Sequence, residues 1–252
     1  MPPYSDRQAL HFQRLAYLAY QVASNLTPKI WLRRIHERVV ERILAPFEAH
    51  PTTGCTRLKE LDIDSENAVQ GVDYAPTPRL IIRWVHAHLP KDLNDWTFVD
   101  IGAGRGRVMI EAAQNNYAKV IGVEFAPELH AEAEKNIAVM DRSRQCAGSL
   151  QLRLGDATRI DVPNGPCVFY LFNPFGASVL EAFLARVLDA HRADPRPMIF
   201  IYINPLCAAT FTRFPRLKQW RPPLAACVKF TLFSPYAMNI FATVEGLCHL
   251  RD

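Results

Sequence analysis

The stretch FVDIGAGRGR, residues 98–107, decides the fold of this 252-residue chain. The apolar run 96–101 predicts a buried parallel strand, and the alternating glycines after it predict a tight turn into a helix over residues 106–115. A strand, a glycine turn and a helix in this order form a nucleotide-type pocket, because the first N–H groups of the helix point at the ligand.

The position of the glycines and of one acid indicates which ligand the pocket takes. A dinucleotide fingerprint reads G-x-G-x-x-G, but here Gly106 comes one position early and Arg107 stands in the fingerprint slot. Asp100, two residues before the first glycine, would repel a pyrophosphate and suits a ligand with a positive charge. An ordinary glycine turn in an unrelated α/β protein is the alternative.

The order Asp-x-Gly-x-Gly-x-Gly resembles motif I of the class I S-adenosylmethionine-dependent methyltransferases. S-adenosylmethionine carries an ammonium and a sulfonium group and no phosphate, which fits an acid at this position. The resemblance implies that the turn binds this cofactor through Asp100, Gly102, Ala103, Gly104 and Gly106.

Strand and helix patterns alternate along the rest of the chain, which indicates a parallel sheet. The expected strands are residues 96–101, 118–124, 150–154, 166–172 and 197–203, and the expected helices include 106–115, 127–140 and 176–189. Residues 227–233 and 238–244 are interpreted as an antiparallel hairpin. The resemblance implies a Rossmann-like, mostly parallel seven-stranded sheet with helices on both faces, closed by such a hairpin.

Two further acids follow the second and third strands. Glu124, followed by Phe125, ends the second strand about 20 residues past the glycine turn, where an acid binds ribose hydroxyls. NAD sites share this acid, and a surface glutamate is the other interpretation. After the third strand come Asp156 and Ala157. The resemblance implies that Asp156 accepts a hydrogen bond from the adenine amino group, whereas a plain turn aspartate is the alternative.

The fourth strand ends in Asn173-Pro174-Phe175, at the sheet edge where ligands bind in open α/β folds. This resembles the Asn/Asp-Pro-Pro-Tyr/Phe motif of amino-group methyltransferases but is one proline short. An amine nucleophile needs acceptors for its N–H bonds, and the Asn173 side-chain oxygen and the carbonyls of residues 171–173 are candidates. Phe175 is a candidate to lie beside a flat or cationic acceptor. A strand-ending turn, in which Asn caps and Pro stops, is the alternative.

The resemblance implies that the segment before the first strand covers the methionine end of the cofactor, with Tyr74 and Thr77 as candidate contacts. Thr77 is also expected to cap a helix that starts at Pro78. We divide the chain into a helical extension and linker over residues 1–72 and a methyltransferase domain over residues 73–252. The extension contains an amphipathic helix from Pro28, interpreted as packed on the domain or as a lid or docking surface.

The composition and net charge limit the classes of protein that are compatible with this sequence. The net charge is +4 and the pI about 8.8, far from the dense positive charge of a dedicated nucleic-acid binder. The six cysteines form no C-x-x-C pair, so neither a metal site nor a redox motif is expected. No segment has the length of a membrane span, and the scattered cysteines suit a cytoplasmic location.

The sequence therefore predicts a class I S-adenosylmethionine-dependent methyltransferase that releases S-adenosylhomocysteine. The end of its fourth strand resembles uncharacterised bacterial members and, more remotely, protein-lysine methyltransferases without a SET domain. The acceptor is expected to be an amine nitrogen of a protein or a small molecule. O-methylation of a small molecule and a non-catalytic cofactor-binding module are the alternatives.

Overall fold

The structure is a computed structural model that describes residues 52, 55–57, 71–234 and 236–251. The amphipathic helix expected from Pro28, and the rest of the extension before residue 52, lie outside the described residues.

A seven-stranded sheet forms the centre of the molecule, in the order β3-β2-β1-β4-β5-β7-β6. Its strands are β1 (Thr97–Ile101), β2 (Lys119–Glu124), β3 (Leu150–Leu154), β4 (Cys167–Phe172), β5 (Met198–Ile203), β6 (Lys218–Trp220) and β7 (Met238–Ala242). The first five are parallel, while β7 runs antiparallel to both β5 and β6. This confirms the expected mostly parallel, Rossmann-like seven-stranded sheet with a C-terminal antiparallel pair.

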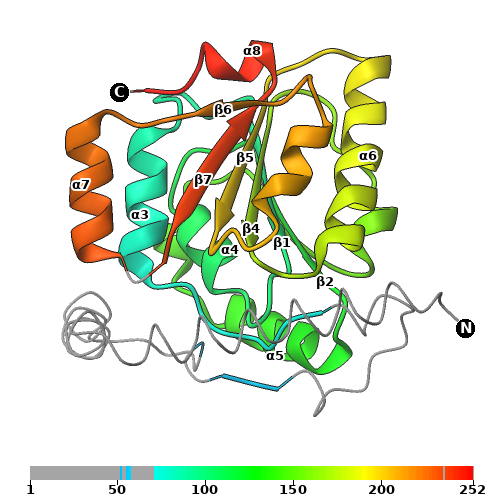
Figure 1. Cartoon of the computed structure of the whole chain (residues 1–252). Helices are drawn as coiled ribbons and strands as arrows, with labels where there is room; N and C mark the ends of the chain where they lie inside the picture. Colours follow the sequence, from blue (N-terminus) through cyan, green and yellow to red (C-terminus); the bar gives the residue numbers. More distant parts are fainter. Residues whose placement is uncertain (1–51, 53–54, 58–70, 235, 252) are drawn as a thin grey trace, which may run out of the picture.

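Helices cover both faces of the sheet. They are α3 (Arg79–His88), α4 (Arg107–Ala112), α5 (Pro127–Ala138), α6 (Ala177–Ala193), α7 (Leu224–Phe233) and the short α8 (Val244–Leu247), with 3₁₀ turns η3 (Arg142–Arg144), η4 (Ala157–Arg159) and η5 (Ala208–Arg213). Helix α6 flanks one side of the sheet, and α3 and α7 lie on the other (Figure 1). All six residues of β5 are buried, as expected for a strand covered on both faces.

The C-terminal hairpin prediction was wrong in its first strand. Residues 224–233 form the helix α7, and β7 pairs antiparallel with β5 and with the three-residue strand β6. The apolar run of α7 lacks alternation, so its pattern did not separate strand from helix. Its length of 10 residues and the Pro223 cap favour a helix. Strand β6 is mostly exposed and has no apolar pattern to reveal it.

The predicted cap of the first described helix was also wrong. Helix α3 begins at Arg79 with Pro78 as its N-cap, and no side chain among the described residues caps it. Thr77 is buried, and its hydroxyl oxygen accepts a hydrogen bond from the Tyr170 hydroxyl at 3.5 Å. The Thr77 side chain therefore contacts the end of the sheet and leaves the start of the helix uncapped. In the described part of the chain, no helix is both long and apolar enough to traverse a lipid bilayer.

Candidate active site

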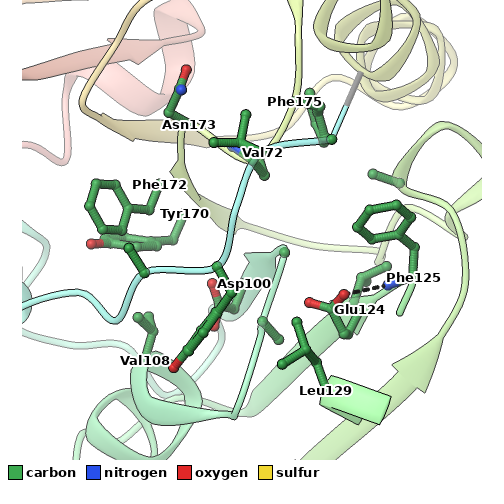
Figure 2. A pocket seen from close by; sticks show the side chains of 18 of the residues that line it. Val72, Asp100, Val108, Glu124, Phe125, Leu129, Tyr170, Phe172, Asn173 and Phe175 are labelled. Atoms are coloured by element: carbon green, nitrogen blue, oxygen red, sulfur yellow. Dashed lines mark hydrogen bonds between the residues drawn. The ribbon is translucent and has the colours of Figure 1, made fainter. Parts of the chain in front are cut away.

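A pocket lies at the carboxyl ends of β1, β2 and β4, the edge at which open parallel sheets bind ligands (Figure 2). Residues 71–77, which we call the strap, form one wall of it. Most of the predicted site residues line this pocket: Tyr74, Thr77, Asp100, Gly102, Ala103, Glu124, Phe125, Asp156, Ala157, Asn173, Pro174 and Phe175. Gly104 and Gly106 lie in the turn just behind its lining.

The three glycines of the turn each have a backbone that only glycine adopts readily. Gly102, Gly104 and Gly106 have φ values of 78°, 53° and 82°, in the left-handed region. A Cβ on Gly104 would lie 2.1 Å from Cε2 of Tyr74, and one on Gly102 would lie 2.9 Å from Cβ of Pro174. The turn is therefore packed against the strap on one side and against the end of β4 on the other.

Glu124 is a buried carboxylate held by the backbone. Its Oε2 accepts the Gly104 N–H at 2.7 Å, and its Oε1 accepts the N–H groups of Phe125 and Ala126 at 3.0 and 2.9 Å. Burial raises the pKa of Glu124, while these three N–H donors lower it. Two carboxylate oxygens offer about four lone-pair sites, so at least one remains for a ligand hydroxyl.

Asp100 is a buried carboxyl group with a very different environment. It is 2% exposed, and its Oδ2 has no hydrogen-bond partner among the described residues. Burial, and secondly the negative charge of Glu124, raise the pKa of Asp100 well above its usual range. Buried carboxyl oxygens normally have a hydrogen-bond partner, and this oxygen has none among the described residues. A cationic or donor group of a ligand would supply one.

Asp156 has a turn role in the structure. Its Oδ1 accepts the backbone N–H of Thr158 at 2.8 Å and the Thr158 hydroxyl at 2.7 Å, which caps the turn η4. Asp156 and Ala157 also line the pocket. The turn role considered as an alternative is therefore present, and Asp156 has this role while lining the pocket.

Asn173 lies at the pocket edge, but its side chain contacts the neighbouring strand. Its φ is 41°, and its Oδ1 accepts a hydrogen bond from the Tyr202 hydroxyl at 2.8 Å. In Figure 2 the Asn173 amide is turned away from Asp100 and Glu124. The Tyr202 oxygen in turn accepts the N–H of Cys207 at 3.3 Å. Tyr202, which holds the Asn173 side chain, was missed by the sequence analysis because it lies in a fully buried strand. The one feature that could have indicated it is a tyrosine hydroxyl near the end of that strand.

The strap is tied to the end of β4 and to the glycine turn. The N–H of Val72 donates to the Pro174 carbonyl at 3.3 Å, and Gly71 forms an antiparallel bridge with Phe175. The Tyr74 hydroxyl donates to the Thr52 carbonyl at 3.1 Å, and burial raises the pKa of Tyr74 to about 12. Val72 crosses the pocket between the Asn173 end and Asp100 (Figure 2).

Arg107, the residue that broke the dinucleotide fingerprint, joins α4 to the strap. It is 4% exposed, its Nε donates to the Thr52 hydroxyl oxygen at 2.9 Å, and its Nη1 donates to the Thr77 carbonyl at 3.2 Å. These bonds give Arg107 a structural role, and Arg107 also lines the pocket. Within the described ranges, no group of three or more His, Cys, Asp or Glu residues is placed to hold a metal ion.

Comparisons with known proteins give only distant likenesses. No family model matches the chain, and no curated protein matches it. An RNA methyltransferase from Salinibacter ruber in complex with S-adenosylhomocysteine is 17% identical, with a TM-score of 0.42, over 67% of this chain and 92% of that one. The ribosomal protein L11 methylase of Lactobacillus delbrueckii subsp. bulgaricus is 16% identical, with a TM-score of 0.38, over 58% and 69%.

A geranyl diphosphate methyltransferase in complex with S-adenosylmethionine is 13% identical, with a TM-score of 0.44, over 66% of this chain and 84% of its own. These solved structures include methyltransferases that hold the cofactor or its product. All three likenesses are below 20% identity and below a TM-score of 0.5. The choice of ligand therefore depends on the chemistry of the pocket itself.

Proposed function

We propose that the chain is an S-adenosylmethionine-dependent methyltransferase that transfers the methyl group to an amine nitrogen. The observation that carries this proposal is the buried Asp100 carboxyl, whose Oδ2 has no partner in the described chain, in the same pocket as Glu124. A ligand that combines a positive charge with ribose hydroxyls satisfies both acids. A dinucleotide does not, because its pyrophosphate would meet Asp100.

The residues present fit this cofactor. Asp100 would pair with the positively charged methionine end, and Glu124 would accept from a ribose hydroxyl. Phe125, Asp156 and Ala157 would surround the adenine, while Tyr74 and Thr77 in the strap would cover the methionine end. Gly102 and Gly104 have no Cβ, which lets Pro174 and Tyr74 pack closely against the turn beside the pocket.

When bound, S-adenosylmethionine supplies an electrophilic methyl group together with its leaving group. The chain's own residues then have to align the acceptor and exclude water, and alignment of this kind supplies roughly 7–11 kcal/mol in well-oriented systems. The strap closes the pocket over the turn, and buried Tyr170 forms part of the wall. We assign no general base, since neither a His nor a Cys is among the described residues that line the pocket.

Amine specificity is supported by Asn173, Pro174 and Phe175 at the pocket edge. The Asn173 side-chain oxygen already accepts from Tyr202, so we assign the N–H groups of the acceptor to the main-chain carbonyls of Phe172 and Asn173. The Asn173 side chain would then hold the turn that aims these carbonyls. Phe175 would lie beside the acceptor as a flat apolar surface.

Calorimetry with S-adenosylmethionine, S-adenosylhomocysteine and NADH tests the cofactor first. We expect the two adenosyl ligands to bind and NADH not to bind. Asp100→Asn should weaken binding at least tenfold, whereas Asp161→Asn, at an exposed position outside the pocket, should leave it unchanged. Binding of neither adenosyl ligand would remove the proposal, and binding of NADH alone would favour a dehydrogenase.

Transfer of tritium from labelled S-adenosylmethionine to lysate fractions tests the acceptor. Label in protein or small amines supports N-methylation, and alkali-stable N-methyl products should be recovered on hydrolysis. Label only in O-methylated small molecules would support the O-methyltransferase alternative. Label in RNA would refute a protein or small-molecule acceptor, and label on an oxygen or carbon atom of RNA would also refute amine specificity. Cofactor binding without methyl transfer to any fraction would support a non-catalytic module. In an active protein, Asn173→Ala should abolish methyl transfer and retain cofactor binding.

A further inference from the structure

Two carboxyl groups line the same pocket, but their surroundings stabilise a negative charge to very different degrees. Glu124 accepts three backbone N–H groups, which stabilise its charged form. Asp100 has a fully buried Oδ2 with no partner in the described chain, and its main electrostatic neighbour is Glu124 itself. An isolated charge in such a place is costly, and a buried carboxyl group usually avoids this cost by keeping its proton.

Four of the titratable or charged residues that line the pocket with Asp100 come from four different segments. Glu124 comes from β2, the Tyr170 hydroxyl from β4, Tyr74 from the strap and Arg107 from α4. Tyr170 and Tyr74 both have a raised pKa, caused mainly by burial and also by the charge of Asp100, so they are neutral neighbours at ordinary pH. Arg107 directs its Nε and Nη1 to Thr52 and Thr77.

We propose that Asp100 is a neutral carboxylic acid in the resting pocket and releases its proton when the cationic group of a ligand arrives. The O–H bond of Asp100 breaks, the proton passes to solvent, and the carboxylate that remains pairs with the ligand cation. This inference rests on the proposed function for the identity of the ligand. It adds that binding of the amino-acid end of the cofactor is coupled to the loss of one proton.

The direction of the pH effect follows from the coupling. The bound state holds fewer protons than the free state, so affinity rises with pH, by up to tenfold per pH unit per proton released. A ligand that has the nucleoside but no cationic group gains no binding free energy from the Asp100 carboxylate. Asp100 thereby discriminates between S-adenosylhomocysteine, which carries an ammonium group, and 5′-methylthioadenosine, which shares its nucleoside and lacks the charge.

Calorimetry in pairs of buffers with different ionisation enthalpies measures the number of protons released on binding. With the full chain between pH 5 and 9, we expect S-adenosylhomocysteine to release up to one proton more than 5′-methylthioadenosine at the lower pH values. The nucleoside-only ligand serves as the control for Glu124, because both ligands carry the ribose. Equal proton numbers for the two ligands across this range would overturn the inference and leave the cofactor assignment standing.

A variant then assigns the proton to one residue. Asp100→Asn should remove the difference between the two ligands, and exposed Asp161→Asn should retain it. A difference that persists in folded Asp100→Asn would also overturn the inference. The wild-type comparison of the two ligands needs no variant, so the inference can be refuted even if the asparagine protein does not fold. Failure of both ligands to bind would instead refute the proposed function.

Discussion

The two sides of the pocket are built in different ways. On one side, β1, β2 and the glycine turn bring Asp100 and Glu124 together within 25 consecutive residues, and each acid lies at or beside the end of its own strand. On the other side, Asn173 depends on Tyr202 of the next strand, and Pro174 depends on Gly102 and on Val72 of the strap. The first side is encoded locally, whereas the second is assembled from distant segments.

The largest expected effect comes from comparing a buried ion pair with an exposed one, both outside the pocket lining. Arg79 and Glu111 join α3 to α4 at 2.7 Å, with both side chains less than 9% exposed, whereas Arg213 and Glu181 are 66% and 44% exposed beside α6. We expect Glu111→Ala to lower the free energy of unfolding by about 3–5 kcal/mol, since it removes the carboxylate that pairs with a buried guanidinium. Glu181→Ala should cost less than about 1 kcal/mol. Urea denaturation measures both, and equal losses would contradict this difference in burial.

The next test disturbs the contact between the turn and the strap. Gly104→Ala has to place a Cβ against Tyr74 in a left-handed backbone, which we expect to cost roughly 2–4 kcal/mol of stability and to weaken S-adenosylhomocysteine binding. Gly155→Ala is the matched control, because a Cβ there meets no atom within 4 Å. Its melting temperature should be unchanged or slightly higher. If Gly104→Ala were as stable as Gly155→Ala, the strap would move away from the new Cβ at little cost in free energy.

The pH dependence of stability tests the locally encoded side without a ligand. The folded state raises the pKa of Asp100 above its unfolded value near 3.8, so it binds more protons than the unfolded state. Stability should therefore fall as pH rises from about 4 toward the folded pKa, by up to about 1.4 kcal/mol per pH unit. Denaturant unfolding at several pH values should show a shallower fall for Asp100→Asn. Parallel curves for the two proteins would exclude a protonated Asp100.

The smallest expected effect lies on the assembled side. Tyr202→Phe removes the hydroxyl that joins Asn173 to the Cys207 N–H, which should cost about 1–2 kcal/mol of stability. We expect S-adenosylhomocysteine affinity to stay the same, because Tyr202 does not line the pocket, and methyl transfer to fall. Calorimetry and tritium transfer measure the two quantities separately. A large loss of cofactor affinity would mean that the two sides are not independent.

The difference between the locally encoded side of the pocket and the side assembled from distant segments also explains which features could be predicted from the sequence. The glycine turn, β1, β2 and Glu124 were predictable because their turn chemistry and apolar runs are local. The fold class was confirmed, but α7 was predicted as a strand because its apolar run has no period that excludes one. Thr77 contacts Tyr170, a residue 93 positions away, and no local pattern shows this. Tyr202 was missed for the same reason, since its partner Asn173 is 29 positions away.

The strap has a consequence for how this protein is shortened for experiments. A fragment that starts at residue 73 would keep every motif residue from Asp100 to Phe175. It would lose the Val72–Pro174 hydrogen bond, the Gly71–Phe175 bridge, and the contacts of Thr52 with Tyr74 and Arg107. The mouth of the pocket would then lack part of its wall. Experiments on ligand binding should therefore start from a chain that includes residue 52, whatever the span of the recognisable motifs.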